Sequence, residues 1–322
     1  MLPYLFLIIG LVLLVKGADL FVEGSSSIAK ILRVPSIIIG LTIVAFGTSA
    51  PEAAVSVTAS IQGQNEIAVG NVIGSNMFNL LVVVGMCAVI RRVRVKRSMI
   101  AKEFPFAILS CLILIMMALD TQLGGQSGPG VKNLLSRADG IILLIFFAMF
   151  LYSLIRFALD SRRQSAGQET EQGAMSISKS ILFSLAGIAG VILGGKLTVD
   201  GASDIAASFG ISQKLIGLTV VAIGTSLPEL VTSIVAARKG ESDLALGNAI
   251  GSNIFNAFFI LGMSSAISPI PFDMTSVYDM VILGAASLLV YFFAVSKKKI
   301  YRPEGIAMIA AYAAYMVYII LR

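Results

Sequence analysis

Charged side chains are scarce in this 322-residue chain, and histidine is absent altogether. Only 13% of the residues are charged, against about a quarter in an ordinary soluble domain. Without histidine, and with Cys87 and Cys111 as its only cysteines, the chain cannot build an imidazole or thiolate metal site or use histidine as a catalytic base. The two cysteines lie in apolar runs and are interpreted as packing residues.

Most of the chain is apolar. Hydrophobic residues make up 57% of the chain, and its mean hydropathy is +0.92. A helix that crosses the hydrocarbon layer needs about 20 mostly apolar residues. Ten stretches have about that length or more: 4–29, 34–60, 67–90, 103–119, 139–157, 180–199, 211–237, 243–267, 276–295 and 304–321. The sequence therefore predicts an all-α integral membrane protein with ten transmembrane helices, its main contact being the lipid bilayer.

The basic residues between these stretches are distributed unevenly. Eighteen of the 24 Lys and Arg residues lie in every second loop, at positions 30, 33, 91, 92, 94, 96, 97, 102, 156, 162, 163, 179, 238, 239, 297, 298, 299 and 302. The positive-inside rule places these loops in the cytoplasm and both termini outside the cell membrane. The net charge of +6 is thus mainly a topology signal, and a nucleic-acid partner is not expected.

The chain repeats itself after 177 residues. Residues 40–79 align without a gap on 217–256, and 22 of the 40 positions are identical. Each half holds five predicted spans, an odd number, so the second half enters the membrane from the opposite side. The sequence predicts two inverted five-helix repeats, 1–159 and 179–322, joined by a short cytoplasmic linker, 160–178, in one transmembrane domain.

Each repeat carries a proline and an acid inside an apolar stretch, in GTSAPE at 47–52 and GTSLPE at 224–229. Pro51 has no N–H, so it leaves the Gly47 carbonyl without its helical partner and kinks the helix. An ionised carboxylate at the middle of a membrane helix costs about 3 kcal/mol or more, and such residues are functional by default. Carboxylate, carbonyl and hydroxyl oxygens suit hard cations. The motifs therefore predict a cation site that contains Thr48, Ser49, Glu52, Thr225, Ser226 and Glu229.

The span after each motif carries polar residues at four-residue intervals, which places them on one helix face. They are Asn71, Ser75 and Asn79 in the first repeat and Asn248, Ser252 and Asn256 in the second. Hydrogen bonding between helices and ion ligation are both open interpretations of this stripe. Gly70, Gly74, Gly247 and Gly251 follow the small-xxx-small pattern and predict close helix packing.

These motifs resemble the paired alpha repeats of the calcium/cation antiporters, and within them of the sodium/calcium exchangers. The resemblance rests on the doubled G-T-S-x-P-E and G-N-x-I-G-S-N-x-F-N blocks and on the ten-span layout. It implies a secondary antiporter that exchanges Na⁺ for Ca²⁺ by alternating access, with spans 4–29 and 180–199 sliding across the other eight. It also implies a protein that is not an enzyme, that needs no cofactor and that functions as a monomer.

The resemblance further implies the ion ligands. Ca²⁺ is expected at Glu52 and Glu229 with the Thr48 and Thr225 carbonyls. Two Na⁺ sites are expected to flank the Ca²⁺ site. The ligands of the first are Ala45, Ser49, Ser75 and Glu52. Those of the second are Ala222, Ser226, Ser252 and Glu229. Asn79 and Asn256 are expected to close the centre. The short linker leaves no room for the cytoplasmic regulatory domains of animal members, which indicates a minimal prokaryotic form.

Asn256 is a departure, because many sodium/calcium exchangers have aspartate at this position. The alternative function within the same class is a proton/calcium antiporter, since an intramembrane glutamate can carry protons. A passive cation channel is a less favoured alternative, because channels arrange their ligands along an open pore whereas this chain concentrates them between two repeats.

Overall fold

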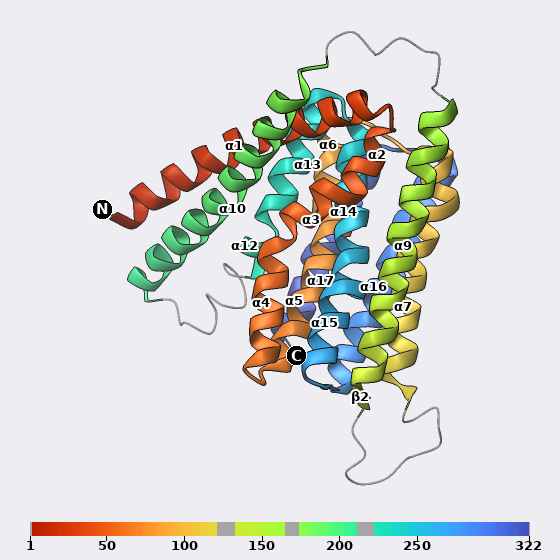
Figure 1. Ribbon diagram of the computed structural model, residues 1–322. Helices are drawn as coiled ribbons and strands as arrows, with labels where there is room; N and C mark the ends of the chain where they lie inside the picture. Colours follow the sequence, from red (N-terminus) through yellow and green to blue (C-terminus); the bar gives the residue numbers. More distant parts are fainter. Residues whose placement is uncertain (1, 121–132, 165–173, 211–221, 322) are drawn as a thin grey trace.

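The computed structural model describes residues 2–120, 133–164, 174–210 and 222–321, and it is a bundle of long helices (Figure 1). Eight of the helices in these ranges are long and apolar enough to cross a membrane. They are α1 (Leu2–Leu32), Asn65–Ile90, Met99–Ala118, α9 (Arg137–Gln164), α10 (Ile177–Ser208), Ser242–Ile267, α16 (Met274–Lys297) and α17 (Arg302–Leu321). The helical, membrane-spanning class predicted from hydropathy is confirmed.

A ninth span is bent. It consists of α2 (Ser36–Ile39), η1 (Gly40–Val44) and α3 (Ala45–Thr48), followed by α4 (Ala50–Ile61), with a bend of 50° between α3 and α4. The equivalent span of the second half is described only from α12 (Ala222–Thr225) through α13 (Leu227–Lys239). Because 211–221 lie outside the described residues, the count of ten spans stays a prediction.

Three of the straight spans contain a turn of π-helix. In Asn65–Ile90, α5 (Asn65–Phe78) passes through η2 (Asn79–Val83) into α6 (Val84–Ile90). In Ser242–Ile267, α14 (Ser242–Ile254) passes through η5 (Phe255–Ile260) into α15 (Leu261–Ile267). Met99–Ala118 begins with η3 (Met99–Glu103) and continues as α7 (Phe104–Ala118). The π-turns η2 and η5 lie at matching places, at Asn79 and at Asn256, and π-turns inside helices are frequent at functional sites.

Two short antiparallel sheets join loops that are distant in sequence. Strand β1 (Val93–Arg94) pairs with β4 (Lys299–Ile300), and β2 (Asn133–Leu135) pairs with β3 (Ile270–Phe272). Each pair connects two loops that the count of basic residues assigned to the same side of the membrane. The ion pair between Lys96 and Asp243 also joins a loop of the basic side to the first turn of α14, which begins on that side. The sequence did not predict the strands, but their pairing agrees with the predicted sidedness of the loops.

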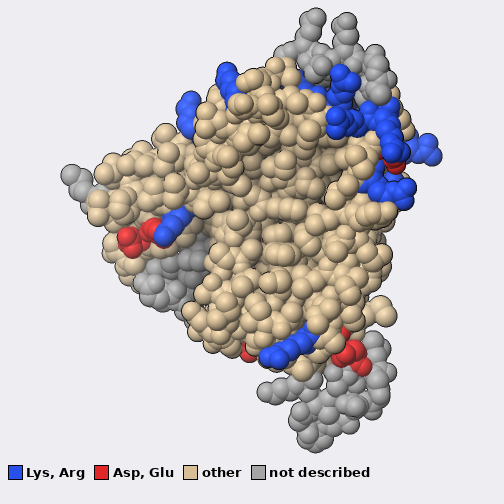
Figure 2. All heavy atoms as spheres, viewed as in Figure 1, with Lys and Arg blue, Asp and Glu red and all other residues tan. Residues whose placement is uncertain are grey.

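The charged surface follows the same division. Figure 2 shows Lys and Arg side chains gathered at the upper end of the molecule, where α9 ends and α10 begins, and a broad middle region with few charges. Among the eight straight spans described, Ser242–Ile267 is the most buried: 94% of the residues in its most apolar stretch are buried. The corresponding share for α17, at the periphery, is 17%. The two motif-bearing halves therefore meet around the most enclosed helices of the bundle.

Helices α1 and α10 form an antiparallel pair that leans away from the other helices (Figure 1). Glycines at seven-residue intervals bring the two backbones together: Gly10, Gly17 and Gly24 on α1, and Gly187, Gly194 and Gly201 on α10. A methyl group at Gly17 would lie 2.6 Å from the Val191 backbone nitrogen, closer than real contacts allow. Since lipid gives helices no hydrophobic reason to associate, such close backbone packing is a main source of attraction between them.

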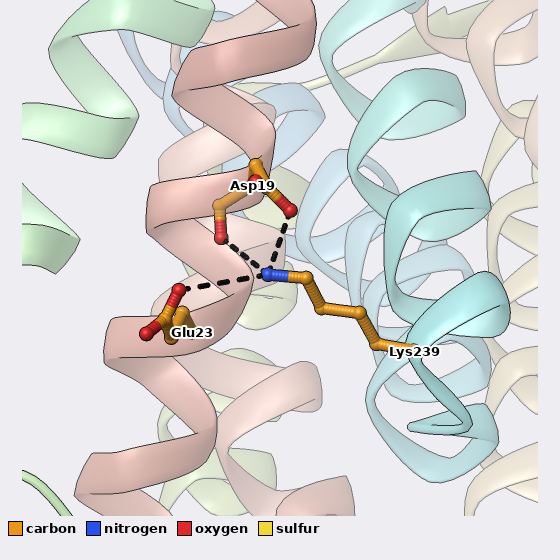
Figure 3. Close-up of polar contacts among 3 residues, drawn as sticks. All are labelled: Asp19, Glu23 and Lys239. Atoms are coloured by element: carbon orange, nitrogen blue, oxygen red, sulfur yellow. Dashed lines mark hydrogen bonds and ion pairs between the residues drawn. The ribbon is translucent and has the colours of Figure 1, made fainter.

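The α1–α10 pair meets the bundle in two places. Phe21, Val22, Ile28 and Ala29 of α1 belong to the main hydrophobic core. Leu14, Ala18 and Val191 form a smaller cluster of their own, which packs against Leu227, Val231 and Val235 of α13. One polar contact accompanies it (Figure 3). Lys239 of α13 lies with its Nζ 2.7 Å from Asp19 Oδ1, 3.0 Å from the Asp19 carbonyl oxygen and 3.8 Å from Glu23 Oε2. All three side chains are partly exposed, so this contact adds about 1 kcal/mol or less.

Close packing is confirmed for only two of the four small-xxx-small glycines in the third spans of the two halves. A methyl group at Gly247 would lie 2.8 Å from the Ile37 carbonyl oxygen, and one at Gly251 2.8 Å from Leu41 Cα. At Gly70 and Gly74 no atom of the described residues comes within 4 Å. The residues that correspond to Ile37, Gly40 and Leu41 under the 177-residue shift are 214, 217 and 218, which lie outside the described residues. Close packing at Gly70 and Gly74 therefore stays a prediction.

The glycine packing of α1 and α10 can be tested with single methyl groups. We expect Gly17→Ala to lower the free energy of unfolding by about 1–3 kcal/mol, because the backbone of α10 cannot move aside without separating the helices. Gly284→Ala in α16 is the matched control, since its methyl group meets no described atom within 4 Å. Thermal unfolding of both variants in detergent is the measurement. Equal stability of the two variants would contradict the packing described here.

Candidate functional site

The two GTSxPE motifs break their helices at the same place. α3 ends at Thr48 and α4 begins at Ala50, with Ser49 between them at φ −83° and ψ 7°. In the second half α12 ends at Thr225, and Ser226 takes nearly the same conformation, φ −92° and ψ 4°. Each proline is the second residue of the new helix, where its missing N–H costs nothing. The break predicted from sequence is confirmed in both motifs.

The break determines where the acids lie. Glu52 is in the first turn of α4, and Glu229 is in the first turn of α13. The N-terminal end of a helix carries a partial positive charge that favours an anion. Both glutamates are nevertheless fully buried, at 0% exposure. The site therefore places two acids where the backbone helps to hold negative charge but water does not reach.

Each glutamate accepts a hydrogen bond from the serine of the other motif. Ser49 donates to Glu229 Oε1 at 2.8 Å, and Ser226 donates to Glu52 Oε1 at 3.1 Å. Ser75 of α5 donates to the same Glu52 oxygen at 3.4 Å. The two motifs thus form one site, and neither half of the chain completes it alone.

Several oxygens of this site remain without a donor. Glu52 Oε2, Glu229 Oε2 and Asn256 Oδ1 are buried and have no hydrogen-bond partner among the described residues, and neither amide atom of Asn79 has one. Buried acceptors are costly unless a donor or a cation meets them. Apart from Asn79 Nδ2, these unpaired atoms are all oxygens. A hard cation fits this donor set, because such ions prefer carboxylate and carbonyl oxygens.

The threonines and alanines expected at the site lie around the break. Thr48 Oγ1 donates to the Val44 carbonyl at 3.1 Å and also lies 3.0 Å from Asn248 Oδ1. Thr225 Oγ1 lies 3.5 Å from Asn71 Oδ1. The Ala45 carbonyl accepts a hydrogen bond of 3.5 Å from Ser252 Oγ. The hydroxyls of both threonines therefore face the other half of the chain.

Ala222 begins α12, one turn before Ser226. Its side chain lies outside what the structure describes. The remaining expected residues, Ser75, Ser252, Asn79 and Asn256, are all at most 2% exposed. Asn256 Nδ2 donates to Ser75 Oγ at 3.2 Å and to Asn76 Oδ1 at 3.0 Å. Its amide group is therefore held in one orientation, with the unpaired carbonyl oxygen on the other side.

Hydrogen bonding explains Asn71 and Asn248, the two stripe residues nearest the acids in sequence. Asn71 Nδ2 donates to the Glu52 carbonyl at 3.3 Å and to Ser56 Oγ at 2.9 Å. Asn248 Nδ2 makes the same two contacts, at 3.3 and 2.9 Å, with the Glu229 carbonyl and Ser233 Oγ. These asparagines fix the backbone that carries each glutamate. Ser56 and Ser233 were missed, although both lie one turn after an acid and match under the 177-residue shift.

A second pair of residues that sequence reasoning missed is Asn76 and Asn253. Asn76 Nδ2 donates to the Asn253 carbonyl at 3.3 Å, and Asn253 Nδ2 donates to the Asn76 carbonyl at 3.1 Å. Both residues are buried, and they bind α5 directly to α14 at the centre of the bundle. The available signal was their identity under the shift, within GSN of each repeat.

The charge at this site comes from two groups only. The described part of the chain contains no cluster of three or more His, Cys, Asp or Glu side chains. All other polar groups that contact the two glutamates are neutral hydroxyls, amides or carbonyls. When both glutamates are ionised, their two negative charges balance one divalent cation or two monovalent cations.

Comparison with known proteins shows which family has a similar sequence and fold. The sequence pattern of the family described as "Sodium/calcium exchanger protein" matches residues 2–156 and 179–321. The putative antiporter CaxA of Alkalimonas amylolytica is 39% identical over 319 residues, which cover 97% of this chain and 96% of that protein. The sodium/calcium exchanger MaX1 of Methanosarcina acetivorans is 33% identical, with 98% and 97% covered.

A solved structure has the same fold. The sodium-calcium exchanger NCX_Mj, soaked with 2.5 mM Na⁺ and 1 mM Sr²⁺, superposes with a TM-score of 0.82 at 35% sequence identity. The superposition covers 98% of both chains. The resemblance stated from the motifs is therefore confirmed, and the minimal prokaryotic form fits these relatives.

The two central asparagines are expected to differ in their contribution to stability. Asn76→Ala removes a donor to Asn253 and an acceptor for Asn256, whereas Asn253→Ala removes one donor only, because Asn253 Oδ1 has no partner among the described residues. At about 0.6–1.7 kcal/mol for each hydrogen bond between membrane helices, Asn76→Ala should cost roughly twice as much. Thermal unfolding in detergent measures both. A larger loss for Asn253→Ala would contradict this network.

Proposed function

This chain belongs to the sodium/calcium exchanger family, a family of membrane transporters, and on that premise we propose that it exchanges Na⁺ for Ca²⁺ across the cell membrane. The observation that carries the proposal is the reciprocal pairing of two fully buried glutamates. Each accepts a hydrogen bond from the serine of the other motif, and each has one oxygen that no described residue meets. Such a site can take ions out of water only by replacing their hydration shells with its own oxygens.

We assign Ca²⁺ to the space between Glu52 and Glu229, with the carbonyls of Thr48 and Thr225 as further ligands. The helix breaks support this assignment, because the last residue of α3 and of α12 is the threonine in question. The flanking Na⁺ sites then use the remaining expected ligands: Ala45, Ser49 and Ser75 with Glu52, and Ala222, Ser226 and Ser252 with Glu229. Asn79 and Asn256 close the centre, which is consistent with their unpaired buried oxygens.

The architecture that accompanies this function is a pair of inverted five-helix repeats, 1–159 and 179–322, with the 160–178 linker on the cytoplasmic side. Contacts that match under the 177-residue shift support the repeat. Each of the two sheets pairs loops that we assign to the same side of the membrane, which supports that assignment. The distribution of basic residues favours the cytoplasm for one side and the outside for both termini. We propose the monomer as the functional unit, because both halves of the site come from one chain.

Alternating access requires one part of the molecule to move against the rest. We assign this movement to α1 and α10. Their backbones pack closely through glycines, so the pair can move as a unit. It meets α13 through a small hydrophobic cluster, while Phe21 and Val22 of α1 would slide against the main core. The polar contact of Lys239 with Asp19 and Glu23 is partly exposed, and its cost of breaking is small.

Uptake of ⁴⁵Ca²⁺ into proteoliposomes tests the proposal. At fixed pH, an outward Na⁺ gradient should drive Ca²⁺ inward against its own gradient, and K⁺ in place of Na⁺ should not. Uptake driven by a proton gradient alone would favour the proton/calcium antiporter, which the sodium/calcium names of the relatives do not support. Uptake that only follows the Ca²⁺ gradient would favour a channel.

The glutamates should be indispensable for transport. We expect Glu52→Gln and Glu229→Gln each to reduce Ca²⁺ uptake more than about tenfold, because each removes half of the site's charge and 1.4 kcal/mol of lost binding already gives a factor of ten. Glu66→Gln is the matched control, since Glu66 is an exposed acid on α5. Near-normal uptake in either site variant, with folded protein by size-exclusion chromatography, would overturn the site assignment.

Exchange should carry current. Two ionised glutamates balance one Ca²⁺, whereas three Na⁺ ions in the same cavity leave one positive charge uncompensated. With 3:1 exchange, a membrane potential that is negative inside should therefore slow Na⁺-driven Ca²⁺ entry, because net positive charge leaves with the Na⁺. The potential is imposed with valinomycin and a K⁺ gradient. Uptake that does not respond to it would indicate 2:1 exchange.

Asn256→Asp should preserve transport but change its response to pH. The amide donates to Ser75 and Asn76, and a carboxylate at this position sets a third acid near Glu52 and Glu229. Like charges at close range make at least one of the three easier to protonate. We expect activity to fall more steeply on acidification between about pH 6 and 8 than in the wild type. Superimposable profiles would place residue 256 outside the ion site.

A further inference from the structure

A third buried glutamate, Glu103, lies far along the chain from the two motifs. It is the last residue of η3, at the beginning of the fourth span, and only 4% of it is exposed. Its Oε2 is buried and has no hydrogen-bond partner among the described residues. The ion site described above does not use it. A carboxylate in such a position is costly unless a cation or a donor meets it.

Glu103 lines a cavity of about 70 Å³ between the beginning of α7 and the last turns of α9. The other lining residues are Lys102, Phe106, Phe150, Ser153, Leu154 and Phe157. Three of the seven lining residues are phenylalanines. Ser153 Oγ donates to the Phe150 carbonyl at 2.8 Å, so its hydrogen is already used. The Lys102 ammonium is near enough to attract the Glu103 carboxylate, but no described group donates a hydrogen bond to Glu103 Oε2. The cavity therefore combines one unpaired acceptor oxygen with aromatic rings.

The chemistry of these walls favours an organic ammonium group. A divalent metal ion needs six or more oxygens, and the cavity presents one carboxylate. An ammonium group needs an acceptor for its hydrogens and is attracted by aromatic faces. The volume admits a group the size of a few water molecules, which suits a primary ammonium. A trimethylammonium group is larger and has no N–H to donate to Glu103.

A phosphate can bind at the mouth of the cavity. Lys102 is exposed there, and its Nζ lies 5.4 Å from the centroid of the Phe157 ring. It can therefore turn from the ring toward an anion without leaving the cavity. A ligand with a primary ammonium and a phosphate a short distance apart would satisfy Glu103 and Lys102 together.

The surface next to the cavity is suited to acyl chains. α7 and α9 expose large apolar side chains on the side of the cavity away from the loops: Leu109, Leu112, Met149 and Tyr152. The loops that flank Glu103 and the end of α9 carry the basic residues that indicate the cytoplasmic side. The cavity thus lies at the depth of the lipid headgroups, at the edge of an apolar, membrane-facing surface.

We propose that this cavity binds the headgroup of an aminophospholipid of the cytoplasmic leaflet, with the primary ammonium against Glu103 and the phosphate at Lys102. The site is independent of the ion site, and its test does not depend on transport.

Native mass spectrometry of the purified protein tests the proposal, with phosphatidylethanolamine, phosphatidylcholine and phosphatidylglycerol of identical acyl chains added in turn. We expect the wild type to retain phosphatidylethanolamine at least about threefold more than phosphatidylcholine. Glu103→Gln should abolish this preference, while Glu66→Gln, an exposed acid on another span, should keep it. Lys102→Gln should lower the retention of both lipids alike, because both carry the phosphate.

A second variant guards against misfolding of Glu103→Gln. Ser153→Leu fills the rim of the cavity without changing its charge, and it should also abolish the preference. Equal retention of the ethanolamine and choline lipids by the wild type, or an unchanged preference in both variants, would overturn the proposal. Preference for phosphatidylglycerol would indicate an anion site at Lys102 instead. Displacement of the lipid by free ethanolamine at equal concentration would reassign the cavity to soluble amines.

Discussion

Two carboxylates in a medium that cannot solvate them are the constraint on which the rest of this structure depends. Helices fully enclose both acids, so each needs a hydrogen-bond donor from the protein. Each half of the chain supplies a donor to the acid of the other half: Ser49 donates to Glu229, and Ser226 donates to Glu52. The site therefore exists only when both halves are folded against each other. The hydrogen bonds between Asn76 of α5 and Asn253 of α14 help to hold them in that relation.

The helix breaks are a second consequence of the same constraint. A continuous helix would leave each acid beside backbone groups that are already hydrogen-bonded. Interruption at Ser49 and at Ser226 instead places each acid in the first turn of a helix, where free N–H groups carry partial positive charge. The asparagines at 71 and 248 then hold the carbonyl of each glutamate, so that the new helix begins in a fixed orientation.

Much of this could be predicted from sequence, because membrane spans and proline breaks depend on local features. Hydropathy located the spans to within a few residues at most ends, and Pro51 with its repeat partner located the breaks. The cross-pairing of loops by β1 and β4 could not be predicted, since it joins residues more than 200 apart by backbone groups that any sequence supplies. Spacing alone could not tell which asparagines of the stripe hold the backbone and which face the ion site. Asn71 donates to a backbone carbonyl and to a serine, whereas neither amide atom of Asn79 has a partner among the described residues.

Several central contacts are isologous: Ser49 donates to Glu229 as its counterpart Ser226 donates to Glu52, and Asn76 and Asn253 donate to each other's carbonyls, as in a two-fold dimer of identical subunits. A gene encoding a single half could have assembled this interface from two copies, but any mutation would then have altered both ends of the assembly. Fusion into one chain removes that restriction. The ion pair of Lys239 with Asp19 is an example, because the counterpart of Lys239 is Gln62 and that of Asp19 is Lys196. The repeat within one chain thus lets the two ends of the molecule carry different charges around a polar centre whose main contacts match between the halves.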